Sequence, residues 1–378
     1  MREIYLDNSA TTKVCPEAVQ KMVEIMTEHY GNPSSLHLKG HRAEKELESA
    51  RKTIAEMLSA DKEEIYFTSG GTEGNNTAVF GAVNALKRRG KRIVTTAMEH
   101  SSVMESMQKL EKDGFEVIYL SPDKSGKITP ESVANALTAD TILVSMMTVN
   151  NETGTIQPVE KVGKIVKKAN SFCLFHTDAV QAFGKIPLKP KKWGVDLLTA
   201  SSHKIHGPKG AGILYLRKDA RIVPLHYGGE QEHKLRPGTE PLPNIVGMSE
   251  AVKALPDMDS EYHSMKELNL YCREKLSHID NVYIHSDTDC LPYILNFSAE
   301  GIRSETMLHF LEEQGIYVSS GSACAKGKKS HVLKALELPD SLIDSAVRVS
   351  FSRYNSKEDI DELAKALINA NNTLARSR

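Results

Sequence analysis

Short apolar runs alternate with amphipathic helical stretches between about residue 60 and residue 216. The apolar runs predict strands at Ile93–Thr96, Glu116–Leu120, Thr141–Met146, Phe172–His176, Asp196–Ala200 and Gly212–Leu216. The amphipathic stretches predict helices at Ser102–Lys112, Glu131–Leu137 and Val159–Asn170. Alternation of this kind is typical of an α/β fold, in which helices cover both faces of a mostly parallel sheet.

The pattern changes after Gly228, where residues 228–243 read GGEQEHKLRPGTEPLP and predict a long functional loop. A helical stretch follows from about Asn244 to His278. Strands are expected near Val282, Ile294 and Val347, and a C-terminal helix from Ser356. We therefore predict a large α/β domain over residues 15–250. Residues 1–14 and 251–378 would form a smaller α+β domain.

Composition excludes several classes of protein. The 48 basic and 49 acidic side chains balance, so nothing indicates a nucleic-acid partner. The N-terminus MREIYLDNSATT does not resemble a signal peptide, and no apolar run approaches the roughly 18 residues of a membrane span. Five cysteines without a CxxC pair make a poor disulfide framework and a poor metal site. We expect a cytoplasmic protein with neither membrane anchor nor bound metal.

Lys204 is the first candidate functional residue. It lies in TASSHKIHGPKGAG (residues 199–212), between an apolar strand and a turn rich in glycine and proline. Taken alone, a lysine here could equally be a solvated loop residue. In a partly desolvated site, however, its amine would be nucleophilic enough to form a Schiff base.

Asp178 strengthens that interpretation. It lies in HTDAVQ (residues 176–181), just after an apolar run, where α/β folds bind ligands. A carboxylate there could cap a helix, which is the commoner role. It could also pair with the pyridine nitrogen of pyridoxal phosphate, because a protonated ring is the better electron sink.

A third motif, FTSGGTEGNN (residues 67–76), runs from a strand end through glycines into a helix. Gly71, Thr72 and Glu73 would open that helix, and its backbone N–H groups beside the Thr72 hydroxyl would suit a phosphate. A glycine-rich turn alone is weak evidence, since such connections often need glycine.

Two more polar residues follow predicted strands. His100, in AMEHSSV, could stack on a cofactor ring and move protons, although a lone histidine is more often a packed or surface residue. Asn151, in VNNETG, could bond a phenolic oxygen of the ring.

Together these motifs resemble the class V aminotransferase family of fold-type I enzymes, and more narrowly the cysteine desulfurases of the NifS/IscS type. The resemblance extends nearly end to end and is specific because the motifs occur in order. The remaining matches are YLDNSATT, GNPSSLH, RPGTEP, SSGSACAKGK and VRVSFSRYNSKEDID.

The resemblance implies pyridoxal 5'-phosphate as cofactor and a role for each matching residue. Lys204 would carry the Schiff base, Asp178 would pair with the pyridine nitrogen, and His100 would stack on the ring. Gln181 would contact the phenolic oxygen, while Asn151 and Arg348 would bind the substrate carboxylate. The phosphate would be held by Gly71, Thr72, Ser201 and His203, with Thr239 from a second subunit of a homodimer. Arg348 could instead form a surface ion pair, but its apolar strand argues against that.

Cys324 decides the expected chemistry. It lies in YVSSGSACAKGKKSHVL among small residues, with Lys326, Lys328 and Lys329 close behind, and nearby cations favour a thiolate. By resemblance it would take sulfur from L-cysteine as a persulfide, release alanine, and pass the sulfur to an acceptor protein. Acceptors in iron–sulfur cluster assembly, tRNA thiolation, or the synthesis of thiamine or another thio-cofactor are candidates.

Other functions stay open at this point. A selenocysteine lyase would turn over cysteine poorly, and an aminotransferase would not need Cys324. A non-catalytic docking protein would be expected to lack Lys204 or Asp178, and both are present.

Overall fold

The structure is a computed structural model that describes residues 2–320 and 329–375. Its strands are β1 Ile4–Tyr5, β2 Ile65–Thr68, β3 Arg92–Thr96, β4 Glu116–Leu120, β5 Thr141–Ser145, β6 Leu174–Asp178, β7 Leu197–Ser201, β8 Gly212–Leu216, β9 Val282–Ile284, β10 Ile294–Ala299, β11 Ile316–Tyr317 and β12 Ala346–Ser350. Its helices are α1 Pro16–Thr27, α2 Leu38–Met57, α3 Gly71–Leu86, α4 Ser101–Lys112, α5 Pro130–Ala136, α6 Val159–Ala169, α7 Pro190–Trp193, α8 Leu242–Lys253, α9 Met258–Ser277, α10 Ser304–Glu312, α11 His331–Ala335, α12 Asp340–Asp344 and α13 Lys357–Thr373. Short 3₁₀ turns are η1 Lys62–Glu64, η2 Ser202–Lys204 and η3 Gln231–Lys234.

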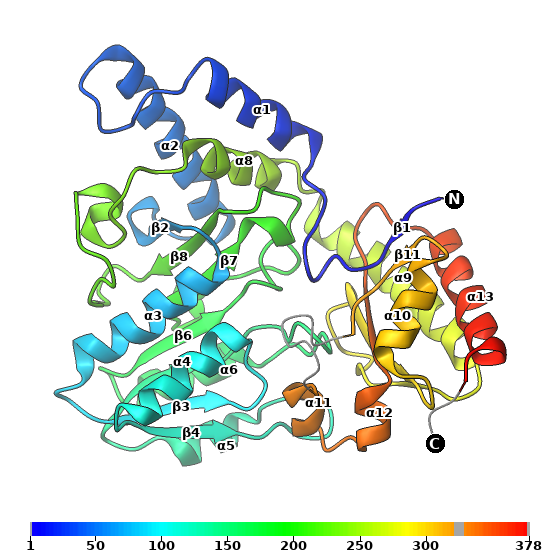
Figure 1. Cartoon of the computed structure of the whole chain (residues 1–378). Coiled ribbons are helices and arrows are strands. Elements are labelled where there is room, and N and C mark those ends of the chain that lie inside the picture. The colour runs from blue at the N-terminus through cyan, green and yellow to red at the C-terminus, as the bar shows by residue number, and fades with distance from the viewer. Residues whose placement is uncertain (1, 321–328, 376–378) are drawn as a thin grey trace.

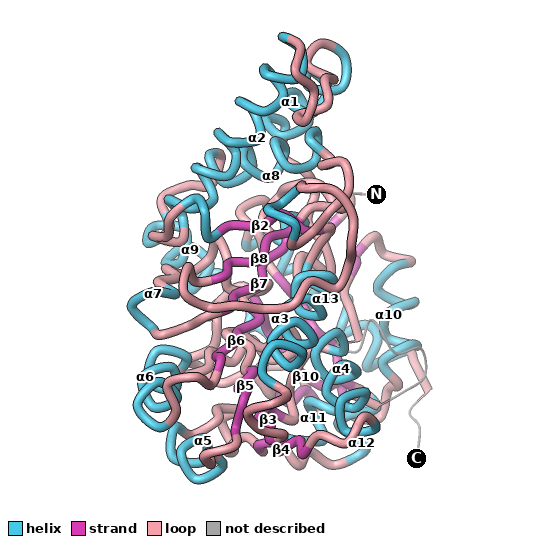
Figure 2. The backbone as a smooth tube through the Cα atoms, turned by 90° about the vertical axis from the view of Figure 1, so that its left-hand side faces the viewer, coloured by secondary structure: helices cyan, strands magenta, loops and turns pink. Residues whose placement is uncertain are grey.

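A seven-stranded sheet in the order β2-β8-β7-β6-β5-β3-β4 forms the centre of the larger part of the molecule. All its pairings are parallel except the two made by β8, which runs antiparallel to β2 and β7. Helices α3 and α4 cover one face, and α5, α6 and α7 lie on the other (Figures 1 and 2). Strands β5, β6, β7 and β8 are buried throughout, as expected for strands covered on both faces.

The second part of the molecule is built around the antiparallel sheet β12-β10-β9, with α9, α10 and α13 beside it (Figure 1). The N-terminal strand β1 pairs with β11, so the first residues of the chain join the C-terminal half. The proposed domain boundaries, with residues 15–250 in the large domain, stay predictions. Among the described residues, no helix is both long enough and apolar enough to cross a bilayer.

The predicted fold class is confirmed, with a mostly parallel sheet flanked by helices (Figure 1). One predicted helix is wrong. The stretch Asn244–His278 is two helices, α8 and α9, separated by residues 254–257. Pro256 lies in that gap, and proline cannot donate the backbone hydrogen bond that a continuous helix would need there.

The parallel strands bring their carboxyl ends to one edge of the central sheet. Strands β3, β5, β6 and β7 end at this edge, and the segments that follow them carry His100, Asn151, Gln181 and Lys204. The carboxyl edge of an open α/β sheet is the usual ligand site of such folds, so the candidate site is sought here.

Candidate active site

Asp178, the last residue of β6, is the buried acid of the site, with 5% of its surface exposed. Its Oδ2 accepts a hydrogen bond from Asn75 Nδ2 at 2.7 Å, and its Oδ1 accepts one from the Val180 backbone N–H at 2.9 Å. Asn75 lies on α3, the helix packed over the strand ends. The carboxylate is therefore held in one orientation by neutral donors, which leaves it able to pair with a cationic ring nitrogen.

His100 is linked to Asp178 through two side chains. Asn75 Nδ2 also donates to Ser102 Oγ at 2.9 Å, and Ser102 Oγ lies 2.8 Å from His100 Nδ1. His100 is the N-cap of α4, and its Nδ1 accepts from the Ser102 backbone N–H at 3.2 Å. A backbone N–H can only donate, so the network assigns the proton of the neutral ring to Nε2.

The electrostatic surroundings keep His100 neutral. Burial lowers the pKa of its imidazole, and the nearby Lys204 and His331 lower it further, against an opposing effect of Asp178. A neutral ring can stack on a cofactor without adding a second cation beside the lysine.

Lys204 ends η2 directly after β7, and its side chain lies against the N-terminal segment. Its Nζ donates to the carbonyl oxygens of Ser9 at 2.5 Å and Ala10 at 2.7 Å. Gln181 Nε2 donates to the same Ser9 oxygen at 3.0 Å. The Ser9 carbonyl oxygen thus contacts both Gln181 and Lys204, two of the residues that the sequence assigns to the cofactor.

A second carboxyl group lies beneath the site but differs from Asp178 in its environment. Glu99 is fully buried, and burial, with a contribution from the charge of Asp178, raises the pKa of its carboxyl to about 8. Glu99 therefore holds its proton at pH 7, and the site does not carry two adjacent negative charges.

The N-terminus of α3 provides a place for a phosphate. Ser201 Oγ, at the end of β7, is buried without a hydrogen-bond partner in the described structure, and an added Cβ on Gly70 would lie 3.8 Å from it. A side chain at Gly71 would bring its Cβ within 2.8 Å of Val180 Cγ2, so only glycine fits without movement. Thr72 follows in the first turn. An orphaned hydroxyl at a helix N-terminus is well suited to an anion.

His203 lies between Ser201 and Lys204 on η2, with Nδ1 3.2 Å from Thr11 Oγ1. Burial and the neighbouring Lys204, with smaller effects of other lysines, lower the pKa of its ring to about 4. The ring is neutral at pH 7, so it would bind a phosphate through an N–H hydrogen bond and not through charge.

Arg348 lies on β12 in the smaller sheet and is 2% exposed. Its Nη2 pairs with Asp7 Oδ1 at 2.8 Å, and its Nη1 donates to the Asn151 carbonyl oxygen at 2.8 Å. Its Nε is buried without a partner in the described structure. The predicted substrate residues Arg348 and Asn151 are therefore in direct contact, although they come from different sheets. The surface ion-pair alternative for Arg348 does not agree with its burial.

The segment after Cys324 is attached to the same region. Ser330 Oγ donates to Glu152 Oε2 at 2.5 Å, and the ring nitrogen Nε2 of His331 lies 2.9 Å from the Glu99 carbonyl oxygen. Glu152 follows Asn151 directly in the chain. The start of α11 is thus held beside His100 and the substrate residues.

Cys324 itself lies outside the described residues. The other cysteines, Cys15, Cys173, Cys272 and Cys290, are all buried. Burial raises the pKa of each of these thiols, to about 12 for Cys173 and Cys272. A buried thiol that holds its proton is a poor nucleophile, which leaves Cys324 as the candidate.

Thr239 is exposed, on the segment between β8 and α8. Within this segment Glu232, His233 and Lys234 all have positive φ, and a buried ion pair holds Glu232 against Arg51 at 2.8 Å. Arg236 Nε also donates to Glu73 Oε1 at 2.8 Å, next to the candidate phosphate site at the start of α3 in its own chain. These contacts anchor the chain at η3 and at Arg236, shortly before Thr239.

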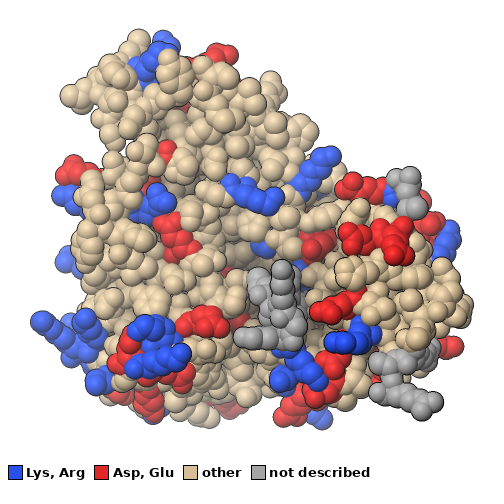
Figure 3. Space-filling view, in the orientation of Figure 1, with Lys and Arg blue, Asp and Glu red and all other residues tan. Residues whose placement is uncertain are grey.

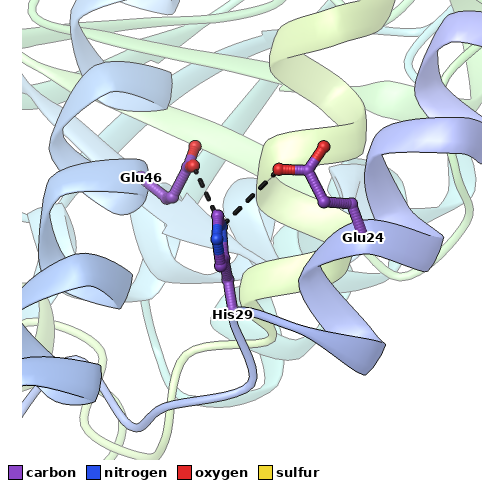
Figure 4. Close-up of side chains that lie close together, drawn as sticks. All are labelled: Glu24, His29 and Glu46. Atoms are coloured by element: carbon purple, nitrogen blue, oxygen red, sulfur yellow. Dashed lines mark ion pairs between the residues drawn. The ribbon is translucent and has the colours of Figure 1, made fainter.

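Among the described residues, one group has ligand atoms close enough for a metal ion: Glu24, His29 and Glu46 (Figure 4). It joins α1 to α2, far along the chain from the strand ends. Lys21 Nζ donates to both carboxylates, at 2.6 and 3.2 Å, and supplies the positive charge that they need. We assign no metal to this group.

The sequence did not single out Asn75, Ser102, Asp7 or Glu152, although each lies inside a motif that it identified. The only sequence signal for each of them was the motif that contains it: FTSGGTEGNN for Asn75, MEHSSV for Ser102, YLDNSATT for Asp7 and VNNETG for Glu152. Their roles arise from contacts between these motifs, which no single motif contains.

The described residues fit pyridoxal phosphate. A buried carboxylate suits its pyridine nitrogen, the unpartnered Ser201 hydroxyl beside a helix N-terminus suits its phosphate, and an amine within the same site suits its aldehyde.

Comparison with known proteins supports this fit. The Aminotransferase class-V family matches residues 4–363. A cysteine desulfurase IscS of Dictyoglomus turgidum is 43% identical over 365 residues, covering 95% of this chain and 92% of that protein. A NifS/IcsS protein homolog of Lactobacillus delbrueckii is 44% identical over 373 residues, or 96% of each chain. A solved NifS-like protein has a TM-score of 0.94 at 38% identity, covering 99% of this chain and 100% of that one. The chain therefore belongs to the aminotransferase class-V family, within its pyridoxal phosphate-dependent cysteine desulfurases of the NifS/IscS type.

Proposed function

We propose that this enzyme removes sulfur from L-cysteine, holds it as a persulfide on Cys324, and passes it to an acceptor protein. The observation that carries the proposal is a pair of hydrogen-bonded networks at the carboxyl edge of the central sheet, one joining Asp178 to His100 through Asn75 and Ser102, the other joining Gln181 to Lys204 through the Ser9 carbonyl oxygen. When bound, pyridoxal phosphate supplies an electron sink for the charge that develops on the substrate Cα.

The chain's own residues would hold the cofactor and move protons. Asp178 would keep the proton on the ring nitrogen, and Gln181 would donate to the phenolic oxygen. Lys204 would hold the aldehyde and, once displaced by substrate, take the proton from Cα. His100 would stack on the ring with its Nε2 proton available for transfer. Gly71, Thr72, Ser201 and His203 would hold the phosphate.

The substrate would be oriented by its carboxylate. Arg348 presents a planar guanidinium suited to two parallel hydrogen bonds, and Asn151 lies against it. In the described structure Asp7 occupies one end of that guanidinium, so the substrate carboxylate would compete with Asp7. The substrate sulfur would then face the thiolate of Cys324. A sulfur–sulfur bond forms as the carbon–sulfur bond breaks, and the remaining carbon skeleton gains a proton to become alanine.

The direct test uses purified enzyme with L-cysteine and a reductant, with alanine and sulfide quantified together. Equal yields of the two products are expected, because each carbon–sulfur cleavage releases one of each. Little turnover with L-cysteine but rapid turnover with L-selenocysteine would favour a selenocysteine lyase. Exchange with a keto acid, without sulfide, would favour an aminotransferase.

We propose acceptor proteins of iron–sulfur cluster assembly or tRNA thiolation, in the cytoplasm, where thiols stay reduced. The test is transfer of labelled sulfur from the loaded enzyme to each purified acceptor. Transfer to one acceptor and not the other identifies the pathway, and transfer to neither rules out both.

A homodimer is the second part of the proposal. Exposed apolar side chains gather on one part of the large sheet unit: Val19, Val23, Met26, Tyr30, Leu36, Leu38 and Tyr227. The first three lie on one face of α1, and the surface over α1, α2 and α8 carries few charges on the side seen in Figure 3. Apolar surface of this kind is typical of a subunit interface.

We predict that two inactive variants restore one another's activity. Thr239→Glu would repel the phosphate of the partner's site, and Lys204→Met would inactivate its own site. In co-expressed heterodimers, the site with Lys204 receives Thr239 from the other subunit. Random pairing should return about a quarter of wild-type alanine release, since half the dimers carry one intact site out of two. No recovery in purified heterodimers would show that Thr239 does not act across the interface.

A further inference from the structure

Lys185 is a buried amine to which the reaction described above gives no role. It is 7% exposed, and among residues 2–320 and 329–375 no carboxylate lies within ion-pair distance of it. A buried cation without an ion pair is costly. Burial, with repulsion from Lys204 and Arg348, lowers the pKa of its amine to about 7.

The backbone brings Lys185 and Gln181 together. A helical turn follows Asp178, with Phe183 N–H donating to Ala179 O at 2.8 Å and Lys185 N–H to Ala182 O at 3.0 Å. Residues four apart on such a turn share one face. Lys185 Nζ donates to Gln181 Oε1 at 3.4 Å, and it also lies 5.4 Å from the centre of the Tyr293 ring.

Gln181 connects this amine to Lys204. Its Nε2 donates to the Ser9 carbonyl oxygen, which also accepts from Lys204 Nζ. Both partners of Gln181 therefore require the same orientation of its amide. If the amide turned over, Oε1 would face the Ser9 oxygen and the NH₂ group would face the amine of Lys185.

We propose that Lys185 is a positioning residue of the active site, which acts by holding the amide of Gln181 with its NH₂ group toward Ser9 and the cofactor. The inference rests on the proposed contact between Gln181 and the phenolic oxygen. Lys185 itself touches neither cofactor nor substrate in this arrangement.

The charges around Lys185 agree with such a role. Lys204 and His203 face it from η2, His206 from the turn after η2, and Arg348 from β12, while the charge of Glu261 on α9 opposes these cations and raises the pKa of Lys185. The His203 and His206 rings are neutral at pH 7, because the pKa of each is lowered to about 4, so the excess positive charge comes from Lys204 and Arg348. A phosphate and a phenolic oxygen would compensate the excess charge.

The test follows the visible absorption of the enzyme-bound cofactor as a function of pH, in wild type and Lys185→Met. A donor to the phenolic oxygen stabilises its negative charge, and hydrogen bonds to charged groups contribute enough to move a titration midpoint by about one pH unit. The midpoint should therefore rise by about one unit in Lys185→Met. Lys189→Met is the matched control, because it removes the same charge from an exposed position four residues further on. It should titrate as wild type.

A double-variant comparison shows whether the effect passes through Gln181. Gln181→Ala should raise the midpoint by itself, and adding Lys185→Met should then raise it no further. An equal additional shift in the Gln181→Ala background, or an unchanged midpoint in Lys185→Met alone, would overturn the inference. If Lys185→Met does not fold, as judged by circular dichroism, Lys185→Gln removes the charge with less loss of polarity and undergoes the same comparison. A wild-type enzyme without a visible band would instead count against the proposed function.

Discussion

Lys204→Met is expected to stop the release of alanine and sulfide, with a loss of at least about 10³-fold, since general acid–base catalysis alone contributes 10²–10⁴-fold. The variant also loses the amine that would hold the cofactor aldehyde. Methionine keeps the length of the side chain but cannot donate to Ser9 O and Ala10 O, where Lys204 Nζ makes its contacts.

The matching control is Lys209→Met, an exposed lysine in the same glycine-rich turn. It should retain wild-type activity and colour. Alanine is measured after incubation with L-cysteine and added pyridoxal phosphate, and the absorption spectrum is recorded for each variant. In Lys204→Met the spectrum should resemble that of the unattached cofactor. If Lys204→Met turned over L-cysteine at a rate within tenfold of wild type, Lys204 would not have the proposed role in holding the cofactor and moving the Cα proton.

Six of the seven strands of the central sheet were predicted, because each of them is recognisable from its local sequence, whereas β2 was not among the strands whose bounds were predicted. Buried parallel strands such as β5 and β6 overlap continuous apolar runs that the sequence shows locally. Among the other strands, β4 and β8 have the predicted bounds. Asp178, Lys204 and His100 could be selected for a similar reason. Each polar residue comes shortly after an apolar run, and parallel strands bring such positions to one edge.

The connections between these residues could not be predicted in the same way. Asn75 and Asp178 are 103 positions apart, and Asp7 and Arg348 are 341 positions apart. Nothing near any of these residues indicates its partner, because each contact exists only once the elements that carry the two residues have packed together. Lys185 shows the same limit. In sequence it resembles a surface lysine after a turn, whereas in the structure it is buried and charged groups on η2, α9 and β12 act on it.

The break between α8 and α9 was missed for a different reason. Apolar and polar residues on either side of residues 254–257 continue a helical pattern, and the prediction gave that pattern more weight than Pro256. A proline inside an amphipathic stretch is local evidence for a helix end, and in this chain α8 does end just before Pro256.

Cys324→Ala is expected to abolish both products while leaving the cofactor and substrate sites intact. None of the four described cysteines can replace it, because burial raises the pKa of each thiol and keeps it protonated. The residues proposed to bind L-cysteine and to move its Cα proton lie elsewhere in the sequence, on β12, η2 and the turn after β5. L-cysteine should therefore still change the visible spectrum of Cys324→Ala, with no alanine or sulfide formed.

Cys290→Ala is the control, since it removes a thiol that is buried at 5% exposure and held between Arg273 and the Ile294 carbonyl oxygen. It should cost some stability but keep the product yields equal. If Cys324→Ala still released alanine and sulfide in equal amounts, sulfur would be leaving without a persulfide on this residue. If it released alanine without sulfide, the chain would be acting on its substrate by a route that needs no thiol. Only the loss of both products, with spectral binding of L-cysteine retained, separates the thiol's role from that of the cofactor site.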